Sequence, residues 1–140
     1  MRRIKWALPT VPAMVALLVG MWAAPASAAT DSAITTADYC SVGALTDTVD
    51  RTTKVSGGGW MTCRSRNYHI RLWVTLYRDG AAISTAVCEE IPSFDGTCDT
   101  STTVTDRWAG NQRWQTRAKG EYDWFGSKRT VTAWSSNVYH

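Results

Sequence analysis

Few side chains in this 140-residue sequence have the types that catalysis needs. Its two histidines are His69, which lies in an alternating stretch with no identifiable nucleophile partner, and His140 at the end of the sequence. The patterns Gly-x-Ser-x-Gly and His-Glu-x-x-His are absent, and so is a glycine-rich loop that would bind phosphate. We therefore predict that the protein is not an enzyme, and that it has no catalytic residue and no cofactor.

One acidic cluster has the oxygen atoms that a cation site or a carboxylate pair would need. Its members are Glu89, Glu90, Asp95 and Asp99. Calcium loops order such ligands as Asp-x-Asp-x-Asp-Gly, which does not occur here, and no ordering marks a glycosidase pair. Because charged side chains are mostly exposed, the sequence predicts a solvated acidic loop and no metal site.

The four cysteines, Cys40, Cys63, Cys88 and Cys98, predict two disulfides. No Cys-x-x-Cys spacing is present, which argues against a zinc site. Three pairings are possible, and the sequence alone leaves the connectivity open. We favour Cys40 with Cys63 and Cys88 with Cys98, since the second pair would close the short loop CEEIPSFDGTC.

Aromatic side chains are the strongest candidates for ligand binding. From Tyr68 to Tyr77 the sequence alternates, with Ile70, Leu72, Val74 and Leu76 on one side and His69, Arg71, Trp73, Thr75 and Tyr77 on the other. If the aliphatic side faces a core, the other side presents an outward row. That row is either a ligand platform built on Trp73, Tyr77, His69 and Arg71, or a partly covered face with arginine stacked on Trp73.

A second aromatic group lies between Gly110 and Ser136, among arginines and lysines. Alternation places Trp114 in the core and favours the core for Trp134 as well. Tyr122 and Trp124 fall in a glycine-bounded segment, Gly120–Gly126, which we interpret as a bend. Since binding residues concentrate on loops, Tyr122 and Trp124 join the candidate ligand-binding residues. The alternative is that this bend plugs one end of the core.

These residues have to be positioned by short strands. The expected strands are Thr46–Val55, Tyr68–Tyr77, Ala81–Cys88, Ser101–Thr105, Arg113–Lys119 and Thr130–Val138, with a flexible break at Ser56–Gly59 and turns at Arg78–Gly80 and Arg107–Gly110. About six or seven strands without a helical period predict an all-β antiparallel sandwich, with a barrel as the alternative.

The first residues have the layout of a secretory signal peptide. Arg2, Arg3 and Lys5 precede an apolar stretch from about Val11 to Ala24, and small residues follow at 26–28. We therefore predict a signal peptide at 1–28, a loose segment at 29–45 and a single β-sandwich domain at 46–140. The apolar stretch is short for a membrane span, so we expect a secreted, extracellular protein with no stable membrane insertion after cleavage.

Charge argues against nucleic acid as a partner. Residues 29–140 contain 12 basic and 12 acidic side chains, because three of the 15 basic residues lie in the leader. An outward row of Arg113, Arg117 and Lys119, with Lys128 and Arg129, can still form a local basic patch. In an exported protein, such a patch can face the polyanionic polymers of a cell wall.

The segments LWVTLYRDG, VCEEIPSFDGTCDTSTTVT and GNQRWQTRAKG resemble small secreted proteins of actinomycete bacteria. The resemblance covers roughly Trp60 to the C-terminus, and it implies export and a disulfide-bonded β fold but no activity. Secreted subtilisin inhibitors of the same bacteria are similar in size and also have two disulfides. Their reactive-site segment has no counterpart here, and only the loop Glu89–Thr97 with Pro92 offers an analogue.

These observations favour a secreted, non-catalytic protein that binds an extracellular ligand, with a polysaccharide or a cell-wall polymer as the expected partner. Aromatic rings suit sugars because the apolar C–H faces of sugar rings stack on them. The alternative is a protease inhibitor, or another factor that binds a secreted protein, acting through the loop between Cys88 and Cys98. The oligomeric state and the identity of the ligand stay open.

Overall fold

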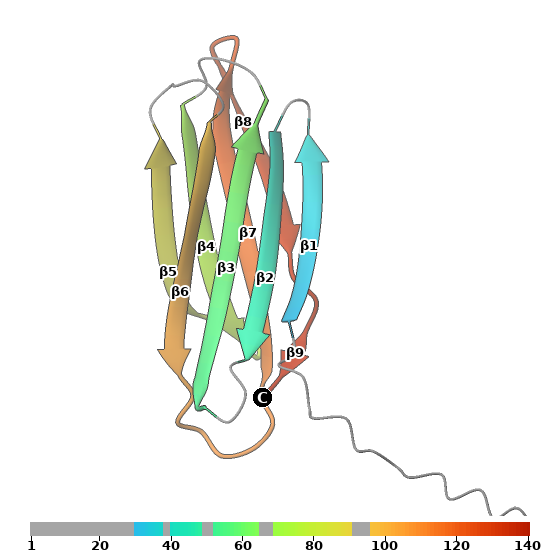
Figure 1. The fold of residues 1–140 in the computed structure, drawn as a ribbon, viewed down its shortest axis with the longest axis vertical. Helices are drawn as coiled ribbons and strands as arrows, with labels where there is room; N and C mark the ends of the chain where they lie inside the picture. Colours follow the sequence, from blue (N-terminus) through green and yellow to red (C-terminus); the bar gives the residue numbers. More distant parts are fainter. Residues whose placement is uncertain (1–29, 38–39, 49–51, 65–68, 91–95) are drawn as a thin grey trace, which may run out of the picture.

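The computed structural model describes residues 30–37, 40–48, 52–64, 69–90 and 96–140, which form two packed antiparallel β-sheets. The strands are β1 (Thr30–Ala37), β2 (Cys40–Thr48), β3 (Lys54–Cys63), β4 (Ile70–Arg78), β5 (Ala81–Glu90), β6 (Thr97–Thr105), β7 (Arg113–Trp124), β8 (Ser127–Trp134) and β9 (Val138–Tyr139). One sheet has the order β1-β2-β3-β6, and the other has the order β5-β4-β7-β8, with β9 paired to β7 (Figure 1). The predicted all-β sandwich is confirmed.

The alternating stretch around Trp73 forms β4, a central strand of the second sheet. Ile70, Leu72, Val74 and Leu76 are completely buried between the sheets, so Trp73 lies on the outer face, as the alternation predicts. β4 turns into β5 through Asp79 and Gly80, which have φ values of 48° and 85°. Two successive positive φ values are those of the tight turn that matches the twist of a hairpin.

The two disulfides confirm the favoured pairing and have different structural roles. Cys40 and Cys63 occupy paired positions of β2 and β3, so this bond lies within one sheet. Cys88 on β5 and Cys98 on β6 join the edge strands of the two different sheets. Two such bonds are typical of an oxidising environment outside the cytosol.

The core lies between the sheets, and Trp114 is its largest buried side chain. Trp114 packs with Val55 and Leu76, which confirms its predicted core position. A larger cluster fills the rest of the interior and includes Met61, Val74 and Tyr122 among others. Burying a side chain of this size contributes roughly 1.5–3 kcal/mol or more, so these residues are a main source of stability for a domain of this length.

Three buried hydroxyl groups connect the sheets through hydrogen bonds. The Thr46 Oγ1 lies 2.7 Å from the Thr116 Oγ1 and 2.7 Å from the Ser135 Oγ. The Ser135 Oγ also accepts a hydrogen bond of 2.9 Å from the Thr116 backbone N–H. Because a buried hydroxyl without a partner is costly, this satisfied group allows polar residues to occupy inward positions on β2, β7 and the segment after β8.

The segment Ser56–Gly59, expected to be a flexible break, is instead the middle of β3. Gly57 and Gly59 point toward the other sheet, and a Cβ on Gly59 would lie 2.7 Å from the Val74 Cγ2 and 2.9 Å from the Ala118 Cβ. Glycine here permits close approach of the two sheets rather than a turn. Glycine composition alone does not separate these two uses.

Other strand boundaries also differ from expectation. The segment 29–45 was expected to be loose, and Thr46–Val55 was expected to be one strand. Instead Thr30–Ala37 and Cys40–Thr48 pair as β1 and β2, and β3 begins at Lys54. The segment Gly120–Gly126, expected to be a bend, continues β7 as far as Trp124. Gly120 points inward, where a Cβ would contact Met61 and Val42, so glycine here allows close packing within a strand. The predicted signal peptide lies outside the described residues.

Trp134, expected in the core, is on the outer face with 43% of its surface exposed. On β8 the inward positions are Val131 and Ala133, and Ser135 follows them into the interior. These small side chains fit the narrow space between the sheets, and the Ser135 hydroxyl is satisfied by hydrogen bonds. Residues of β8 alternate as predicted, but the set that faces inward is the one with Val131 and Ala133 and not the one with Trp134.

Candidate functional site

The outer face of the β5-β4-β7-β8 sheet brings cationic and aromatic side chains together. Arg71 and Trp73 on β4 lie beside Lys119 on β7, and Tyr77, Arg117 and Trp134 form a second group on β4, β7 and β8. We call these six residues the cationic face. Strand register explains the grouping, because Trp73 pairs with Lys119, and Arg117 pairs with both Thr75 and Trp134.

Every ring of the cationic face has one of the protein's own cations near it. The Arg71 guanidinium and the Lys119 Nζ lie 5.6 and 5.4 Å from the centre of the Trp73 ring. Arg117 lies 5.4 Å from the Tyr77 ring and 5.6 Å from the Trp134 ring, and these two rings are 5.2 Å apart. Such distances fall within the range of cation–π attraction. The rings therefore hold the cations in place on a flat sheet.

Within the described residues, two cations of this face lack a carboxylate partner. The carboxylate of Glu89 is bound by Arg71, and that of Glu121 by Lys128 at 3.2 Å. Among the described residues, neither Arg117 nor Lys119 forms an ion pair. The Nε of Arg117 is also buried without a hydrogen-bond partner in this part of the chain. The middle of the face consequently has positive charge that is not neutralised locally.

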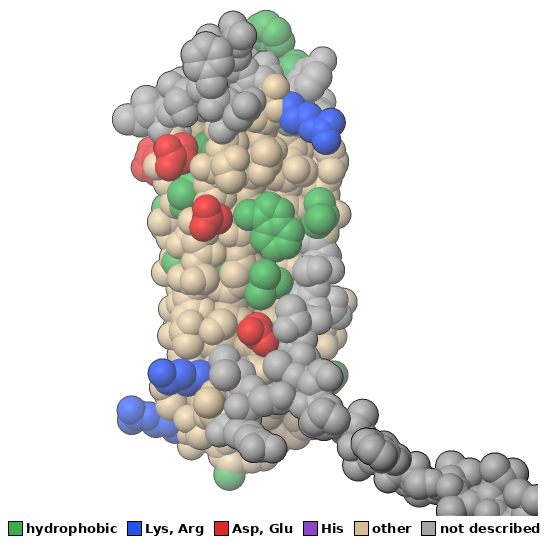
Figure 2. Space-filling view, viewed as in Figure 1, with side chains coloured by type: hydrophobic (Ala, Val, Ile, Leu, Met, Phe, Trp, Pro, Cys, Tyr) green, Lys and Arg blue, Asp and Glu red, His purple; other side chains and the backbone are tan. Residues whose placement is uncertain are grey.

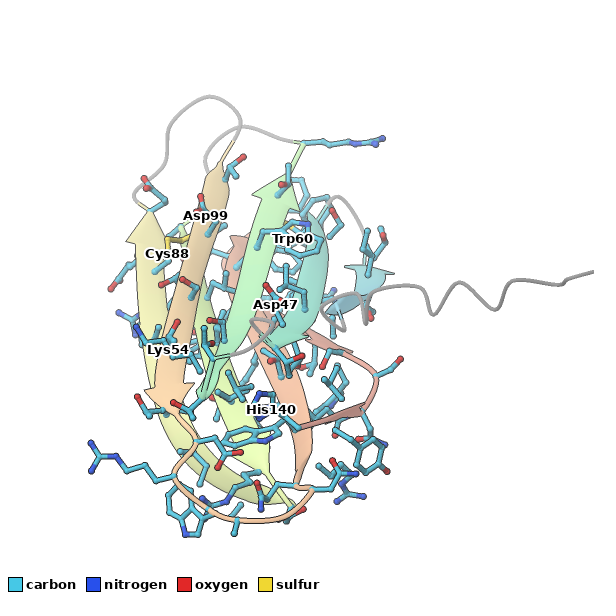
Figure 3. The ribbon with its side chains drawn as sticks, turned by 60° about the horizontal axis from the view of Figure 1, so that its bottom comes forward. Asp47, Lys54, Trp60, Cys88, Asp99 and His140 are labelled. Atoms are coloured by element: carbon cyan, nitrogen blue, oxygen red, sulfur yellow. A yellow bond between two sulfur atoms is a disulfide. The ribbon has the colours of Figure 1, made fainter. Side chains whose placement is uncertain are left out.

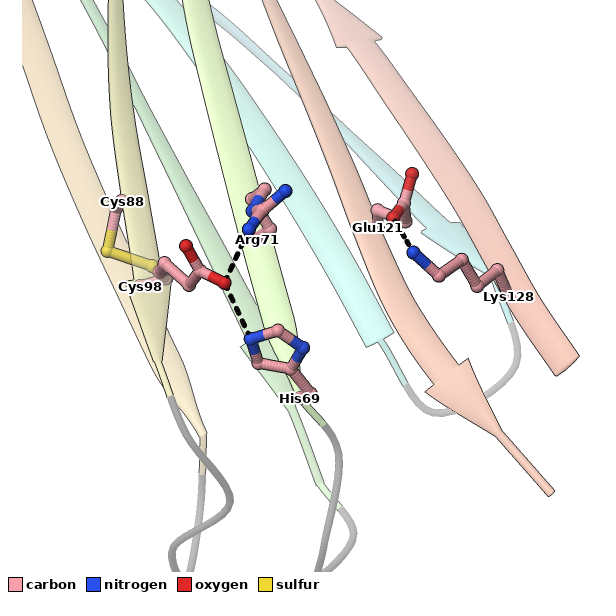
Figure 4. Close-up of polar contacts among 7 residues, drawn as sticks. His69, Arg71, Cys88, Cys98, Glu121 and Lys128 are labelled. Atoms are coloured by element: carbon pink, nitrogen blue, oxygen red, sulfur yellow. Dashed lines mark hydrogen bonds and ion pairs between the residues drawn. A yellow bond between two sulfur atoms is a disulfide. The ribbon is translucent and has the colours of Figure 1, made fainter. Parts of the chain in front are cut away.

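His69, Arg71 and Glu89 form a polar cluster at one end of the face (Figure 4). The Glu89 Oε1 accepts a hydrogen bond of 2.6 Å from the Arg71 Nη2 and lies 2.8 Å from the His69 Nε2. The hydrogen bond from Arg71, assisted by the charge of Arg71 and by His69, lowers the pKa of Glu89. The same contact raises the pKa of Arg71. The Glu89 carboxylate therefore joins Arg71 and His69 at the surface of the sheet.

A small polar hollow adjoins the cluster. It measures about 50 Å³ and is lined by His69, Arg71, Glu121, Tyr122, Asp123 and Lys128. Sites that enclose a small organic molecule usually measure roughly 300–1,000 Å³. A hollow of this size accommodates a water molecule or one small polar group of a ligand. A larger ligand would have to lie across the open sheet face.

The structure separates the residues that the sequence grouped as ligand-binding. Trp73, Tyr77, His69 and Arg71 share the outer face of β4, as expected. Tyr122 does not join them, because its side chain is 1% exposed and belongs to the core. Trp124 is partly buried and packs against the same core. The Phe125 ring lies edge-on to the Trp124 ring, with 4.9 Å between the ring centres, and Phe125 is 89% exposed.

The acidic cluster is also divided between elements. Glu89 is held by Arg71 on one outer face, and Asp99 lies on β6 of the other sheet. Asp95, together with Ile91 and Pro92 of the loop considered for protease inhibition, lies outside the described residues. Within the described residues no group of three or more His, Cys, Asp or Glu side chains could hold a metal ion. The same part of the chain contains no helix that is long and apolar enough to cross a membrane.

Sequence reasoning missed some residues on the outer surfaces of the two sheets. The sequence analysis favours the core for Trp134, but the same alternation with Val131 and Ala133 is equally consistent with an outward Trp134. The sequence predicts an outward basic row that includes Arg117 and Lys119, but it does not show that this row lies beside Trp73. Trp60 is not among the predicted binding residues, because the preceding segment Ser56–Gly59 reads as a break and gives Trp60 no place on a strand.

Comparisons of this chain with protein-family models, with curated proteins and with solved structures found no match in any of the three.

Proposed function

We propose that this protein is a secreted, non-catalytic β-sandwich that binds an anionic extracellular polymer, such as an acidic polysaccharide or a charged cell-wall polymer. The observation that carries the proposal is the pair of unneutralised cations, Arg117 and Lys119, held over aromatic rings on a flat sheet. An open sheet face suits a polymer, which makes several contacts in a row. The disulfides and the predicted leader support an extracellular location.

The arrangement of rings and cations favours an anionic ligand over a neutral one. A neutral sugar that stacked on Trp73 would have to displace Arg71 or Lys119 from the ring. An anionic group could approach the cations directly and leave their contacts with the rings in place. Aromatic side chains also reduce the freedom of the cations before binding, which lowers the entropy lost when a ligand binds.

Binding of the oxidised protein to purified cell wall and to soluble acidic polysaccharide tests the proposal. We expect the double change Arg117→Gln with Lys119→Gln to weaken binding about tenfold, since each exposed charge pair contributes up to about 1 kcal/mol. Binding by the unchanged protein should weaken as salt is raised, because salt screens exposed charges. The double variant should depend less on salt.

A matched control removes two positive charges from elsewhere. Lys54 and Arg64 are exposed at the ends of β3 on the other sheet, so Lys54→Gln with Arg64→Gln changes the net charge equally. We expect this control to keep most of the affinity. Equal losses in both double variants would reduce the effect to net charge and would contradict a defined binding face. Affinity that does not depend on salt would also contradict the proposal.

A further inference from the structure

We propose a second binding site on the opposite sheet, in which Trp60 stacks on the ring of an uncharged sugar and Asp99 accepts hydrogen bonds from its hydroxyl groups. This site lies on the outer face of β1-β2-β3-β6 and shares no residue with the cationic face. The proposal goes beyond the function proposed above, and it stands or falls independently. It assigns a neutral glycan to one face of the sandwich and an anionic polymer to the other.

The Trp60 ring lies across its neighbouring strand. Trp60 on β3 pairs with Gly43 on β2, and a Cβ built on Gly43 would meet the Cε2, Cζ2 and Cη2 atoms of the ring. Because that Cβ would point out of the sheet, the six-membered ring lies flat over Gly43. Figure 3 shows Trp60 on this outer surface. One side of the indole is therefore on the sheet, and the side chain as a whole is partly buried.

The surface around Trp60 is low and polar. Leu45 covers Gly58 in the same way, since a Cβ on Gly58 would lie 3.2 Å from the Leu45 Cγ. Apart from Lys54 and Asp99, the other outward positions on β3 and β6 carry small hydroxyl side chains, with a 2.8 Å hydrogen bond between Ser56 and Thr103. Figure 2 looks onto this face and shows a hydrophobic patch near its middle, with acidic side chains close by. Ile34 on β1 is the register partner of Gly43 and is 66% exposed, so an aliphatic side chain borders the ring on that side.

Asp99 places a carboxylate beside the Trp60 Cβ, on the side of β3 opposite to Gly43. It is the register partner of Trp60 on β6, and directly opposed side chains in an antiparallel pair lie roughly 4.5–5.5 Å apart. Asp99 is exposed, and among the described residues no hydrogen bond or ion pair involves its carboxylate. Asp47 lies further along β2 on the same face. A ligand stacked on Trp60 would find the Asp99 carboxylate as a hydrogen-bond acceptor.

Charge and size select the class of ligand. The carboxylate beside Trp60, that of Asp99, disfavours an anion at this point, while the cations Lys54 and Arg64 lie at the two ends of β3. Within the described residues no cation stacks on Trp60 as cations do on the opposite sheet. The apolar surface consists of Trp60, Leu45 and Ile34, which is much less than the roughly 800 Å² per partner that a stable protein interface buries. A sugar ring fits both features, because its C–H face is apolar and its hydroxyl groups donate hydrogen bonds.

The experiment measures binding of the oxidised protein to a panel of neutral probes: soluble glucans, mannans and N-acetylated amino-sugar oligomers. Affinity electrophoresis detects binding, and the indole N–H signal of Trp60 in NMR spectra, assigned with Trp60→Phe, reports the site. We expect Trp60→Ala to weaken binding at least about tenfold. Asp99→Asn should weaken it less, since the amide oxygen still accepts a hydrogen bond.

Trp108→Ala is the matched control, because Trp108 is an exposed tryptophan that belongs to neither binding face. It should leave neutral-glycan binding unchanged, and Trp60→Phe should retain part of it. If Trp60→Ala does not fold, Trp60→Phe and Asp99→Asn still decide the question. The proposal is overturned if no probe binds, or if binding persists with the Trp60 signal unmoved. Anionic-polymer binding that survives Trp60→Ala separates this site from the cationic face.

Trp60 also has a structural use, since an aromatic ring over a cross-strand glycine stabilises a sheet. Loss of stability in Trp60→Ala is therefore expected whether or not a ligand binds. Asp99 has no such use, because it is exposed and unpaired among the described residues. Loss of glycan binding in Asp99→Ala, with an unchanged unfolding transition, would be the result that a purely structural role does not produce.

Discussion

At the scale of single residues, the cations of this protein differ in what neutralises them. Arg71 is bound to Glu89 and Lys128 to Glu121, whereas Arg117 and Lys119 contact aromatic rings. An arginine already paired with a carboxylate offers less to an anionic ligand than one held by a ring. This is why we assign anion binding to the middle of the face, and treat the His69, Arg71 and Glu89 cluster as support.

Glu89→Gln tests that support through the pH dependence of stability. The contact with Arg71 lowers the pKa of Glu89 in the folded protein below its ordinary value of 4.5. The stabilising effect is therefore fully present above about pH 4.5 and is lost as the pH falls through the lower folded-state pKa. We expect the unchanged protein to melt at a higher temperature than Glu89→Gln near neutral pH, and the difference to vanish in acid.

The neighbouring change, Glu90→Gln, is the control for this measurement. Glu90 is exposed and forms no ion pair with any described residue. Thermal unfolding followed by circular dichroism compares the three proteins at pH values from roughly 2 to 7, which include the pKa range of carboxylates. A melting difference for Glu89→Gln that stays constant down to the lowest pH would mean that the ion pair does not stabilise the fold.

At the scale of strands, the glycines of β3 serve two different purposes. Gly57 and Gly59 allow the second sheet to approach, and Gly58 allows Leu45 to lie flat on the outer face. The strand thus sets both the thickness of the core and the low outer surface on which Trp60 lies. A single strand connects the packing of the interior with the shape of a proposed binding site.

Gly59→Ala and Gly58→Ala should separate these purposes. A methyl group at position 59 would lie 2.7 Å from the Val74 Cγ2 and 2.9 Å from the Ala118 Cβ, so one sheet must move. We expect the free energy of unfolding to fall by about 1–3 kcal/mol, as for other overpacked cores. At position 58 the Leu45 side chain can move into solvent, and we expect a change within about 0.5 kcal/mol.

Chemical denaturation with a two-state fit measures both values. The two variants differ only in which side of β3 receives the methyl group, so each is the control for the other. Equal destabilisation would show that loss of a β-strand glycine, and not the approach of the second sheet, determines the effect. Greater destabilisation of Gly58→Ala would contradict the packing described here.

At the scale of the whole molecule, the sandwich is closed along both sides. The Cys88–Cys98 bond joins β5 to β6 across the gap between the sheets, and a side-chain hydrogen bond joins Ser84 to Thr102 on the same strands. On the other side β1 lies against β8. The two outer faces therefore point in opposite directions. A protein that binds one polymer on each face would connect two polymers.

Replacing Cys88 and Cys98 by alanine tests how far this closure depends on the covalent bond. A closed loop of this length stabilises a protein by about 3 kcal/mol in the chain-entropy model, and we expect a loss of that size. The control is Cys40→Ala with Cys63→Ala, which removes a bond within one sheet. Its expected loss is similar, at about 3–4 kcal/mol.

Hydrogen exchange distinguishes the two variants. Loss of the bond between sheets should raise amide exchange in β5 and β6 selectively, because local opening of these edge strands becomes easier. Loss of the bond within one sheet should raise exchange around β2 and β3 instead. Identical exchange patterns in both variants would mean that the Cys88–Cys98 bond does not hold the two edges together.

The sequence by itself determined the strand class, the disulfide-bonded character and the alternation along β4. Alternating aliphatic residues have a period of two, and a hairpin turn needs residues that tolerate positive φ at Asp79 and Gly80. These properties are local, so they can be read without knowing the partner strands. The outward position of Trp73 follows from them directly.

Only the tertiary structure decided which side of β8 faces inward, and which side chains meet on the outer faces. Alternation divides residues into two sets but does not say which set is buried when both contain polar and apolar members. Val131, Ala133 and Ser135 face the core because the space there is narrow and the Ser135 hydroxyl finds Thr46 and Thr116. Strand order then placed Lys119 beside Trp73, and Asp99 beside Trp60. Such neighbours are distant in sequence, so only the pairing of strands brings them together.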